Sequence, residues 1–212
     1  KKITIIKNEE LNFIYIDDLI DEFIKKINIK IKKKTFIYRI AKTNKISVKK
    51  LAKKLIFFRE ALVKSEIPNL KNIFEKNLYS TYLSYMEQSK AFFKLKSHKD
   101  SRGEFVELFK NINFGQISYF SINKKQIRGN HYHDSKVEKF YLINGKVKFE
   151  FFNIHNNKKS SMILQEKNKR VLFTLPGWSH KIKNIGSDKA NFVVWANEIF
   201  NRKKPDTYYY KF

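Results

Sequence analysis

The sequence predicts a mainly β protein, with a β-sandwich or barrel in its C-terminal part and a smaller, mostly helical segment before it. Three observations predict this division. None of the six glycines lies before Gly103, and the segments before about residue 90 have the apolar spacing of amphipathic helices. From about residue 91 the pattern changes to short β-branched and aromatic runs separated by turn residues. We therefore place one domain at residues 1–90 and a second at residues 91–212.

Two helices are predicted in the N-terminal segment. One begins at Asp17, with acidic residues in its first turn, where the helix dipole favours negative charge. The other begins after Ser47, which suits an N-cap, and extends to about Val63, with Pro68 beyond its end. The tyrosine-rich run Leu78–Tyr85 fits either a third helix or the approach to the second domain.

Ten short strands are predicted after the helical segment. Many short strands with few helices are typical of a β-sandwich or barrel. Asn144-Gly145 is a strong hairpin turn signal between two of them. The expected strands are Ala91–Lys96, Phe105–Lys110, Gly115–Ile122, Asn130–His133, Glu138–Ile143, Lys146–Phe152, Ser161–Gln165, Arg170–Leu175, His180–Asn184 and Ala190–Asn197.

Composition excludes several classes of protein and site. The chain has no cysteine, so disulfides and thiolate metal sites are impossible and an intracellular protein is favoured. No apolar run approaches the roughly 20 residues that span a bilayer, and the N-terminus lacks a signal-peptide core. We therefore expect a cytoplasmic protein with no membrane partner. Because the first residue is Lys1 rather than Met, we expect the chain to begin inside a longer polypeptide.

The net charge of +25 raises the question of nucleic-acid binding. The lysines are spread along the whole length rather than gathered in one tail, and Asn, Ile and Phe, which also have AT-rich codons, are abundant. We interpret the charge as a lysine-coated surface and expect no nucleic-acid partner. Such a surface would still steer an anionic substrate towards the protein.

The C-terminal part contains a two-part motif of metal-ligating residue types. Its first part, H-x-H-x4-E-x6-G, runs from His131 to Gly145, and its second part, P-G-x2-H-x3-N, runs from Pro176 to Asn184. The motif contributes three imidazoles and one carboxylate. This set suits a borderline divalent cation such as zinc and leaves a coordination position open for chemistry. The four candidate ligands are His131, His133, Glu138 and His180.

Strand geometry supports this interpretation. His131 and His133 are two residues apart, so they share one face of a strand while Tyr132 points to the other. His180 follows a Pro-Gly turn, which can bring a distant strand back to the same interior. The alternative is a pair of surface histidines beside an unrelated third. Because three of the five histidines lie in the motif, we predict a metal site.

The two-part motif resembles that of the cupin superfamily, whose members are small β-barrels that hold one metal. The segment Asp100–Glu107, followed by Arg128–His133, also resembles the D-x-R-G-x-F-x-E and R-G-x-H-Y-Q pairing of deoxynucleotide-sugar 3,5-epimerases. In those enzymes the positions that match Arg102, Glu107 and Arg128 contact the nucleotide sugar. The resemblance therefore implies substrate-binding roles for these residues, with ordinary surface charge as the alternative. An Arg fork suits a diphosphate well.

A narrower resemblance concerns the CapF family. Lys136–Phe140, Trp195–Phe200 and Pro205–Tyr208 closely resemble the C-terminal cupin of these bifunctional enzymes, which make UDP-linked 6-deoxy amino sugars for capsular polysaccharide and O-antigen. In that family the cupin inverts C3 of the sugar, and a short-chain dehydrogenase domain then reduces C4 with NADPH. Phe13–Asp21 is similar to a segment found late in such dehydrogenases. The resemblance thus implies that residues 1–90 are the remnant of a truncated α/β dehydrogenase domain and residues 91–212 a jelly-roll cupin barrel.

The chain departs from the dehydrogenase pattern in one respect. A dinucleotide-binding fold needs a Gly-rich turn near its start, so that backbone amides can approach the pyrophosphate. No glycine precedes Gly103, so we expect no NADPH binding and no cofactor-binding residues. Tyr38 and Lys42 have the spacing of the dehydrogenase catalytic pair, but they lie after the segment that should follow it. We interpret this spacing as coincidence.

The resemblance implies a zinc-dependent epimerase acting at C3 of a UDP-4-keto-6-deoxy-N-acetylhexosamine. In metal-free epimerases the histidine that matches His131 is the general base. A metal-bound imidazole nitrogen cannot accept a proton, so we assign His131 to the metal and leave the catalytic base unassigned. Strand alternation aims Tyr132 and Lys139 away from the ligands. We expect Trp195 in the barrel core rather than stacked on a sugar.

Other functions stay open on the sequence alone. The same motif serves iron and manganese, so a metal-dependent cupin dioxygenase is one alternative. A non-catalytic module that only binds sugar nucleotide is another. The partner that we expect is a UDP-linked deoxy amino sugar. We also expect a homodimer, because exposed strand edges favour pairing.

Overall fold

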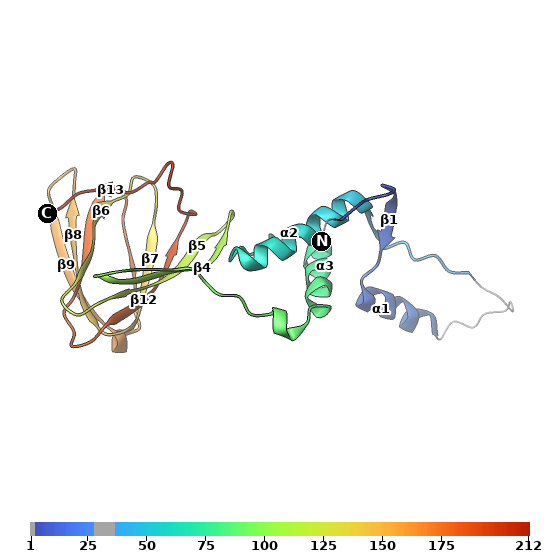
Figure 1. The fold of residues 1–212 in the computed structure, drawn as a ribbon, viewed down its shortest axis with the longest axis horizontal. Coiled ribbons are helices and arrows are strands. Elements are labelled where there is room, and N and C mark those ends of the chain that lie inside the picture. The colour runs from blue at the N-terminus through green and yellow to red at the C-terminus, as the bar shows by residue number, and fades with distance from the viewer. Residues whose placement is uncertain (1–2, 28–36) are drawn as a thin grey trace. The chain divides into compact units, whose positions relative to one another are not determined.

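The computed structural model describes residues 3–27 and 37–212, which form two compact units (Figure 1). The first unit comprises Lys1–Lys64 and Pro68–Phe92, and the second comprises Ser65–Ile67 and Phe93–Phe212. The origin of the first unit in a dehydrogenase domain stays a prediction. Among the described residues, no helix combines the length and apolar character needed to cross a bilayer.

The first unit is mostly helical, with one small antiparallel sheet of two strands. Its elements are β1 (Glu10–Phe13), α1 (Ile16–Ile27), β2 (Asn44–Ser47), α2 (Val48–Val63), α3 (Ile73–Ser84) and the 3-10 turn η1 (Gln88–Lys90). Helix α2 packs on α3 through buried Phe58, whose ring lies 4.9 Å from that of Tyr79 and 5.9 Å from that of Tyr82. This aromatic contact and an ion pair between Lys54 and Glu75 join the two helices.

Local signals define the helix starts. Asp17 lies in the first turn of α1, and Ser47 caps α2 by accepting a hydrogen bond from the Lys50 amide at 3.4 Å, so both predictions are confirmed. Asn72 caps α3 by accepting from the Phe74 amide at 2.8 Å. Most of Leu78–Tyr85 is therefore the end of a helix, which decides between the two alternatives for that run.

The second unit consists of two antiparallel sheets, as the predicted jelly-roll barrel requires. One has the strand order β10-β7-β12-β5-β4-β3 and the other β13-β6-β11-β8-β9. The strands are β3 (Ser97–Asp100), β4 (Gly103–Asn111), β5 (Gly115–Ile122), β6 (Ile127–Tyr132), β7 (Glu138–Asn144), β8 (Lys146–Asn153), β9 (Lys159–Gln165), β10 (Val171–Phe173), β11 (Trp178–Asn184), β12 (Ala190–Ala196) and β13 (Tyr208–Tyr209). A 3-10 turn, η2 (Glu166–Asn168), follows β9. The predicted fold class is confirmed.

The barrel core lies between the two sheets. Phe120 and Phe192 stack with ring centroids 4.7 Å apart, and Phe149 from the other sheet meets Phe192 at 6.2 Å. Each fully buried large apolar side chain contributes about 1.5–3 kcal/mol to folding. The core also includes Ile122, Phe140, Leu142, Val147, Phe151, Leu164, Leu172, Ile182, Ala190 and Val194.

Two sequence predictions were wrong. Ala91–Lys96 is not a strand; strand structure begins at Ser97, because the preceding apolar run has no core to pack against and Phe92 is 80% exposed. Trp195 is not in the barrel core. Its ladder partners are Lys139 and Ile117 on the outer face, and its indole donates to the Phe114 carbonyl at 2.6 Å. Alternation instead turns the neighbouring Val194 inward.

Candidate metal centre

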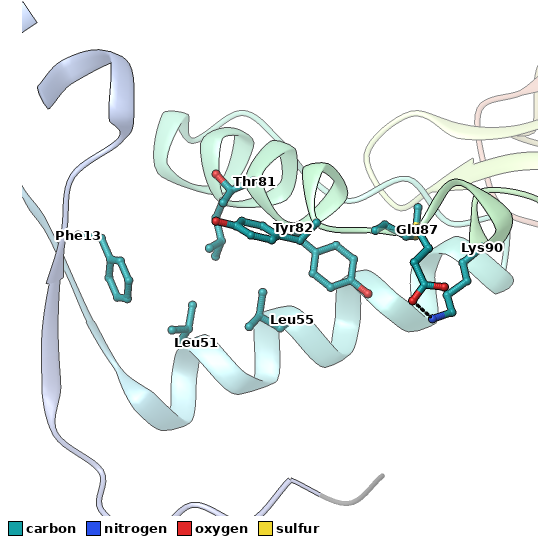
Figure 2. Close-up of a pocket in the computed structure, with 10 residues that line it drawn as sticks. Phe13, Leu51, Leu55, Thr81, Tyr82, Glu87 and Lys90 are labelled. Carbon is teal, nitrogen blue, oxygen red and sulfur yellow. Dashed lines mark ion pairs between the residues drawn. The ribbon is translucent and has the colours of Figure 1, made fainter. Parts of the chain in front are cut away.

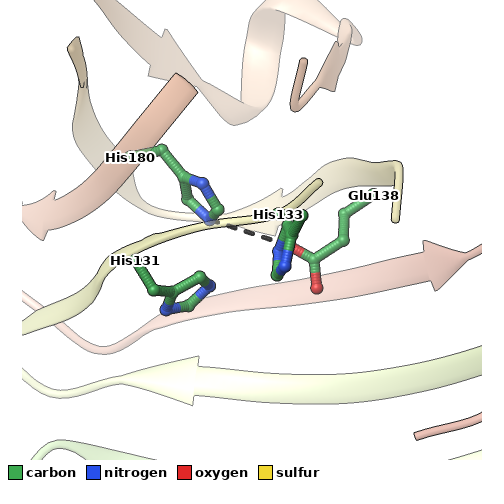
Figure 3. A group of neighbouring side chains, drawn as sticks. All are labelled: His131, His133, Glu138 and His180. Atoms are coloured by element: carbon green, nitrogen blue, oxygen red, sulfur yellow. Dashed lines mark hydrogen bonds and ion pairs between the residues drawn. The ribbon is translucent and has the colours of Figure 1, made fainter. Parts of the chain in front are cut away.

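The four predicted ligands converge at one place in the barrel (Figure 3). Each offers one ligand atom, and these atoms all lie within 4.8 Å of one another. His133 Nε2 lies 3.2 Å from Glu138 Oε2, and His180 Nε2 lies 3.6 Å from the same oxygen. The ring of His131 lies 4.6 Å from that of His180, centroid to centroid. The structure thus brings together the whole predicted set, and its role as a metal site is a proposal.

Strand pairing explains how residues far apart in the sequence meet. His131 of β6 stands directly opposite His180 of β11 in the antiparallel ladder. Directly opposed residues point to the same side of a sheet, so both imidazoles enter the barrel. Tyr132 points the other way, as alternation predicts, and its ring stacks on that of Tyr208 at 5.2 Å.

A β-bulge at Gly129 and Asn130 determines to which side of the sheet the Arg128 side chain points. Arg128 pairs with buried Ile182, whereas His131 pairs with His180, so one residue of β6 is left without a partner. The side chains of Arg128 and His131 therefore both begin on the interior side of the sheet. On a regular strand, two residues three apart would point to opposite sides. Gly129 has φ +104°, and a Cβ there would lie 2.5 Å from the His180 carbonyl oxygen. The R-G-x-H sequence thus has a steric reason for its glycine.

Two hydrogen bonds join the parts of the motif. The Gly177 amide donates to the His133 carbonyl at 2.8 Å, so the Pro-Gly turn before β11 is tied to the end of the first motif. The Glu138 amide donates to the hydroxyl of buried Thr174 at 2.9 Å, which positions the start of β7. These bonds place two distant segments of chain at one site.

The electrostatics of the cluster favour a cation. Burial lowers the pKa of His131 to about 4 and that of His180 to about 3, so both imidazoles are neutral at pH 7. Burial alone would raise the pKa of Glu138, but its hydrogen bond with His133 and the charges of the nearby histidines lower it to about 2. Neutral imidazoles beside an ionised carboxylate are the protonation states that metal ligation requires.

One contact tests whether the residues fit a metal. His133 Nδ1 lies 2.5 Å from the carbonyl oxygen of Asp206, which can only accept, so Nδ1 carries the proton and donates it. In a neutral ring the lone pair of Nε2 then faces the Glu138 carboxylate at 3.2 Å. Two lone-pair donors at this distance require a proton or a cation between them. The donor set therefore fits a divalent metal.

The cluster predicts acid sensitivity of the metal-free protein. In the unfolded chain His131 and His180 protonate near pH 6.5, whereas in the folded chain they protonate only near pH 4 and pH 3. The unfolded chain therefore binds more protons between about pH 6.5 and pH 4, and the free energy of unfolding falls as the pH is lowered. Each histidine contributes a slope of up to about 1.4 kcal/mol per pH unit. Urea denaturation of chelator-treated protein at several pH values measures this slope.

The control for this prediction is an exposed histidine. His180→Gln removes one buried titrating group, so its stability should fall less steeply with pH than that of the wild type. His155→Gln removes a histidine that lies exposed outside the cluster and should keep the wild-type slope. Equal slopes for the wild type and His180→Gln would contradict the assignment of the acid sensitivity to the cluster.

The predicted substrate-binding residues do not form one group. Arg102 and Arg128 meet at Asp100, with Nη2–carboxylate distances of 2.6 Å and 3.5 Å. Arg128 also donates from Nε to the Ser121 carbonyl at 3.0 Å. Glu107 instead stands opposite Ser118 in the ladder and pairs with Lys110. The contact of all three residues with a sugar nucleotide stays a prediction.

Along β5, the position of Ser121, which Arg128 contacts, is far from the position level with Glu138. Glu138 pairs with Ala196, which pairs with Gln116 at the start of β5, whereas Ser121 lies near the end of that strand. At about 3.4 Å per residue, the two levels are on the order of 15 Å apart along β5. A ligand that reached both would be extended, as a nucleoside diphosphate sugar is.

The sequence analysis did not identify the residues that hold His133 and the turn after it in place. Asp206 contacts His133 and the turn after it, and buried Lys136 donates to the Thr207 hydroxyl at 2.8 Å. The run Pro205–Tyr208 carried a family resemblance, but nothing in it indicated a contact with a ligand 73 residues away. Asn184 of the motif is also structural, because its side chain bonds the carbonyls of Ile122 and Asp188.

Among the described residues of the first unit, 3–27, 37–64 and 68–92, there is no comparable site. Tyr38 donates to Glu22 at 3.1 Å, and Lys42 pairs with Asp18, so each has its own partner on α1. A pocket of about 390 Å³ opens between β1, α2 and α3 (Figure 2). Its lining is mainly apolar, and its single acid, Glu87, is paired with Lys90 at 2.9 Å. This pocket contributes no metal-ligating cluster.

Comparison with known proteins agrees with the fold and the motif. The profile of the family described as polysaccharide biosynthesis C-terminal domain matches residues 98–208, just over half of the chain. The chain is 35% identical over 199 residues to the UDP-2-acetamido-2,6-beta-L-arabino-hexul-4-ose reductase of Pseudomonas aeruginosa, a match that covers 94% of this chain and 53% of that protein.

Solved structures lead to the same group. The capsular polysaccharide assembling protein CapF of Staphylococcus aureus matches with a TM-score of 0.88 and 29% identity, over 100% of this chain and 58% of that one. CapF with the inhibitor 3-isopropenyl-tropolone matches with a TM-score of 0.89 and 29% identity, over 100% and 62%. The chain therefore spans between about half and six tenths of the length of these relatives. The chain belongs to the family of polysaccharide biosynthesis C-terminal domains and is of the CapF type.

Proposed function

We propose that the barrel is a zinc-dependent epimerase domain that inverts C3 of a UDP-linked 4-keto-6-deoxy-N-acetylhexosamine for capsular polysaccharide or O-antigen precursors. The observation that carries this proposal is the cluster of three imidazoles and one carboxylate within 4.8 Å, enclosed in a barrel of the CapF type. These four residues would hold the zinc, and a substrate oxygen would bind it as a fifth ligand.

The substrate class is supported by the name of a relative. The Pseudomonas aeruginosa protein is a reductase of a UDP-linked acetamido sugar with a ketone at C4. A ketone at C4 acidifies the proton on C3, so a base can remove that proton and leave an enolate. Reprotonation on the opposite face inverts the centre. Charge develops on the C4 oxygen during this step, and stabilising that charge is the main demand on the site.

Different residues would bind the metal, exclude water and bind the diphosphate. His131, His133, Glu138 and His180 would hold the metal, which supplies Lewis-acid stabilisation of the enolate oxygen when bound. The rings of Phe140 and Phe151 lie 6.0 Å and 6.5 Å from that of His180 and keep water from its inner side. Arg102 and Arg128 would bind the diphosphate. These roles are proposals.

The catalytic base is not assigned. Tyr132 stacks on Tyr208 outside the barrel, and the ammonium of Lys139 lies 5.1 Å from the ring of Trp195 on the outer face. Both side chains point away from the cluster, in agreement with the alternation argument. A base must approach the C3 proton from the interior, so neither of these residues serves.

The arginine pair predicts a measurable loss of binding. Arg102→Ala and Arg128→Ala should each weaken UDP-sugar binding by about 1.5–3 kcal/mol, because each removes a charge-assisted hydrogen bond to the diphosphate. Calorimetric titration with a UDP-sugar measures this effect. Arg59→Ala, on α2, removes the same charge outside the barrel and should bind as the wild type does. Wild-type affinity in both barrel variants would refute the assignment.

We propose that the first unit takes no part in this reaction. Because no glycine precedes Gly103, the chain lacks the turn that cradles a pyrophosphate, and we propose that it does not use NADPH. We also propose a homodimer in the cytoplasm, supported by exposed Met162 and Ile163 on the edge strand β9 and by the absence of cysteine. Light scattering and cell fractionation test these two points. Incubation with the 4-keto sugar nucleotide in D2O tests the proposed reaction itself.

A further inference from the structure

The last eight residues, Pro205–Phe212, form a segment that we call the C-terminal strap. It crosses the sheet that carries two of the candidate ligands. Within it, β13 pairs with β6, so that Tyr208 stands opposite Tyr132 and Tyr209 opposite His131. The Tyr210 amide donates to the Asn130 carbonyl at 2.8 Å. The strap therefore follows β6 beside the cluster.

The end of the strap is held by aromatic and polar contacts. The Ser179 hydroxyl donates to the Tyr210 carbonyl at 2.7 Å, and the Lys181 ammonium donates to the Phe212 carbonyl at 2.8 Å. The rings of Tyr210 and Phe212 both stack on Phe152, with centroids 5.5 Å apart in each pair. Ser179 and Lys181 flank His180 on β11. The strap thus bonds to β6 and β11, the two neighbouring strands that carry His131 and His180.

Asp206 binds the turn that links two ligands. Its Oδ1 accepts the Asp134 amide at 2.8 Å. Its Oδ2 accepts the Ser135 amide at 2.8 Å, the Ser135 hydroxyl at 2.8 Å and the Lys136 amide at 2.7 Å. Four hydrogen bonds on one carboxylate satisfy three successive backbone donors. This turn occupies the four residues between His133 and Glu138, so the carboxylate helps to hold those two candidate ligands in place.

The backbone of the same residue contacts a ligand directly. The Asp206 carbonyl oxygen lies 2.5 Å from His133 Nδ1 and accepts a hydrogen bond from it. That bond holds the proton on Nδ1 and leaves Nε2 free towards Glu138. Hydrogen bonds to the second nitrogen of a metal-binding imidazole fix its tautomer and its ring orientation. The side chain and the carbonyl of Asp206 therefore act on the same pair of ligands.

We propose that Asp206 is a positioning residue of the metal centre, which it preorganises through the turn at residues 134–136 and through the tautomer of His133. This inference rests on the proposed metal centre. Asp206 does not touch the metal position, because its oxygens are used by the turn and by His133. Its removal frees three amide donors and loosens the carbonyl from the imidazole.

Zinc affinity tests the proposal. Competition with a chelator should show that Asp206→Ala binds zinc about 10–100-fold more weakly than the wild type. Asp206→Asn keeps the shape and one acceptor oxygen but places an amide against a backbone donor, so its loss should be smaller. Asp188→Ala makes the same change at an exposed aspartate outside the cluster and should bind as the wild type does. Circular dichroism confirms that each variant is folded, and Asp206→Asn serves if Asp206→Ala does not fold.

A second measurement responds to the tautomer and not to stability alone. Nitrogen NMR of histidine-labelled, metal-free protein should show a proton on His133 Nδ1 in the wild type and an Nδ1 that is only partly protonated in Asp206→Ala. Wild-type zinc affinity together with an unchanged tautomer in a folded Asp206 variant would overturn the proposal. If the wild type binds no zinc, the proposed function fails, and the tautomer alone decides whether Asp206 positions His133.

Discussion

His180→Ala should remove most of the bound metal and lower the melting temperature of the metal-loaded protein. His180 is one of the four candidate ligands, it is almost fully buried, and its ring lies 4.6 Å from that of His131 and 6.0 Å from that of Phe140. Metal binding stabilises the folded chain by mass action, about 2.7 kcal/mol when free metal is one hundred times the dissociation constant. Loss of a ligand removes most of this term, because metal-binding energy is part of the folding energy.

Metal content and thermal melting of the same samples measure this effect. The substitution also leaves a cavity, so the metal-free forms of both proteins must be compared as well. The difference in melting temperature between metal-loaded and metal-free protein should be large in the wild type and nearly absent in His180→Ala. His155→Ala is the matched control, since it removes an exposed histidine outside the cluster. Unchanged metal occupancy in His180→Ala would show that the four residues are not the ligands.

Deuterium should enter C3 of the 4-keto sugar nucleotide when the metal-loaded chain is incubated with it in D2O, without any nicotinamide cofactor. Enolisation needs only a base and stabilisation of the oxygen charge, and the cluster offers the place for that stabilisation. The rate should fall by at least about 10²–10³ in His180→Ala, the usual cost of losing one stabilising group at a developing oxyanion. Proton NMR of the sugar follows the loss of the C3 signal, and His155→Ala should exchange at the wild-type rate.

The same incubation separates the competing functions. Added NADPH should give neither reduced sugar nor loss of absorbance in the nicotinamide band, and its consumption would show that the first unit was misjudged. No exchange with loaded metal would leave a sugar-nucleotide-binding module without turnover. Stoichiometric iron with oxygen uptake would favour a dioxygenase. Together these results distinguish the epimerase from the binding module and from the dioxygenase.

Local sequence patterns were sufficient to predict the candidate ligands and the barrel. The spacing of His131 and His133 is a strand signal that depends only on two-residue alternation, so it could be read without knowing the fold. The cap at Ser47 is equally local, because its hydroxyl meets an amide three residues away. The run at Ala91–Lys96 shows where such reasoning fails. Its composition suits a strand, but strand formation there depends on a neighbouring surface, and Phe92 lies exposed.

By itself, the sequence determined the four candidate ligands, the C-terminal barrel and the helical segment before it, because motif spacing and periodicity are properties of neighbouring residues. Only the tertiary structure decided the bulge at Gly129, the outward direction of Trp195 and the hold of Asp206 on His133. Each of these depends on strand register or on a contact between residues far apart in the chain. The Asp206–His133 bond spans 73 residues, and its partners meet only because β13 lies beside β6. The pairing of strands far apart in the chain is decided only in the assembled sheet, by which face of each strand is buried.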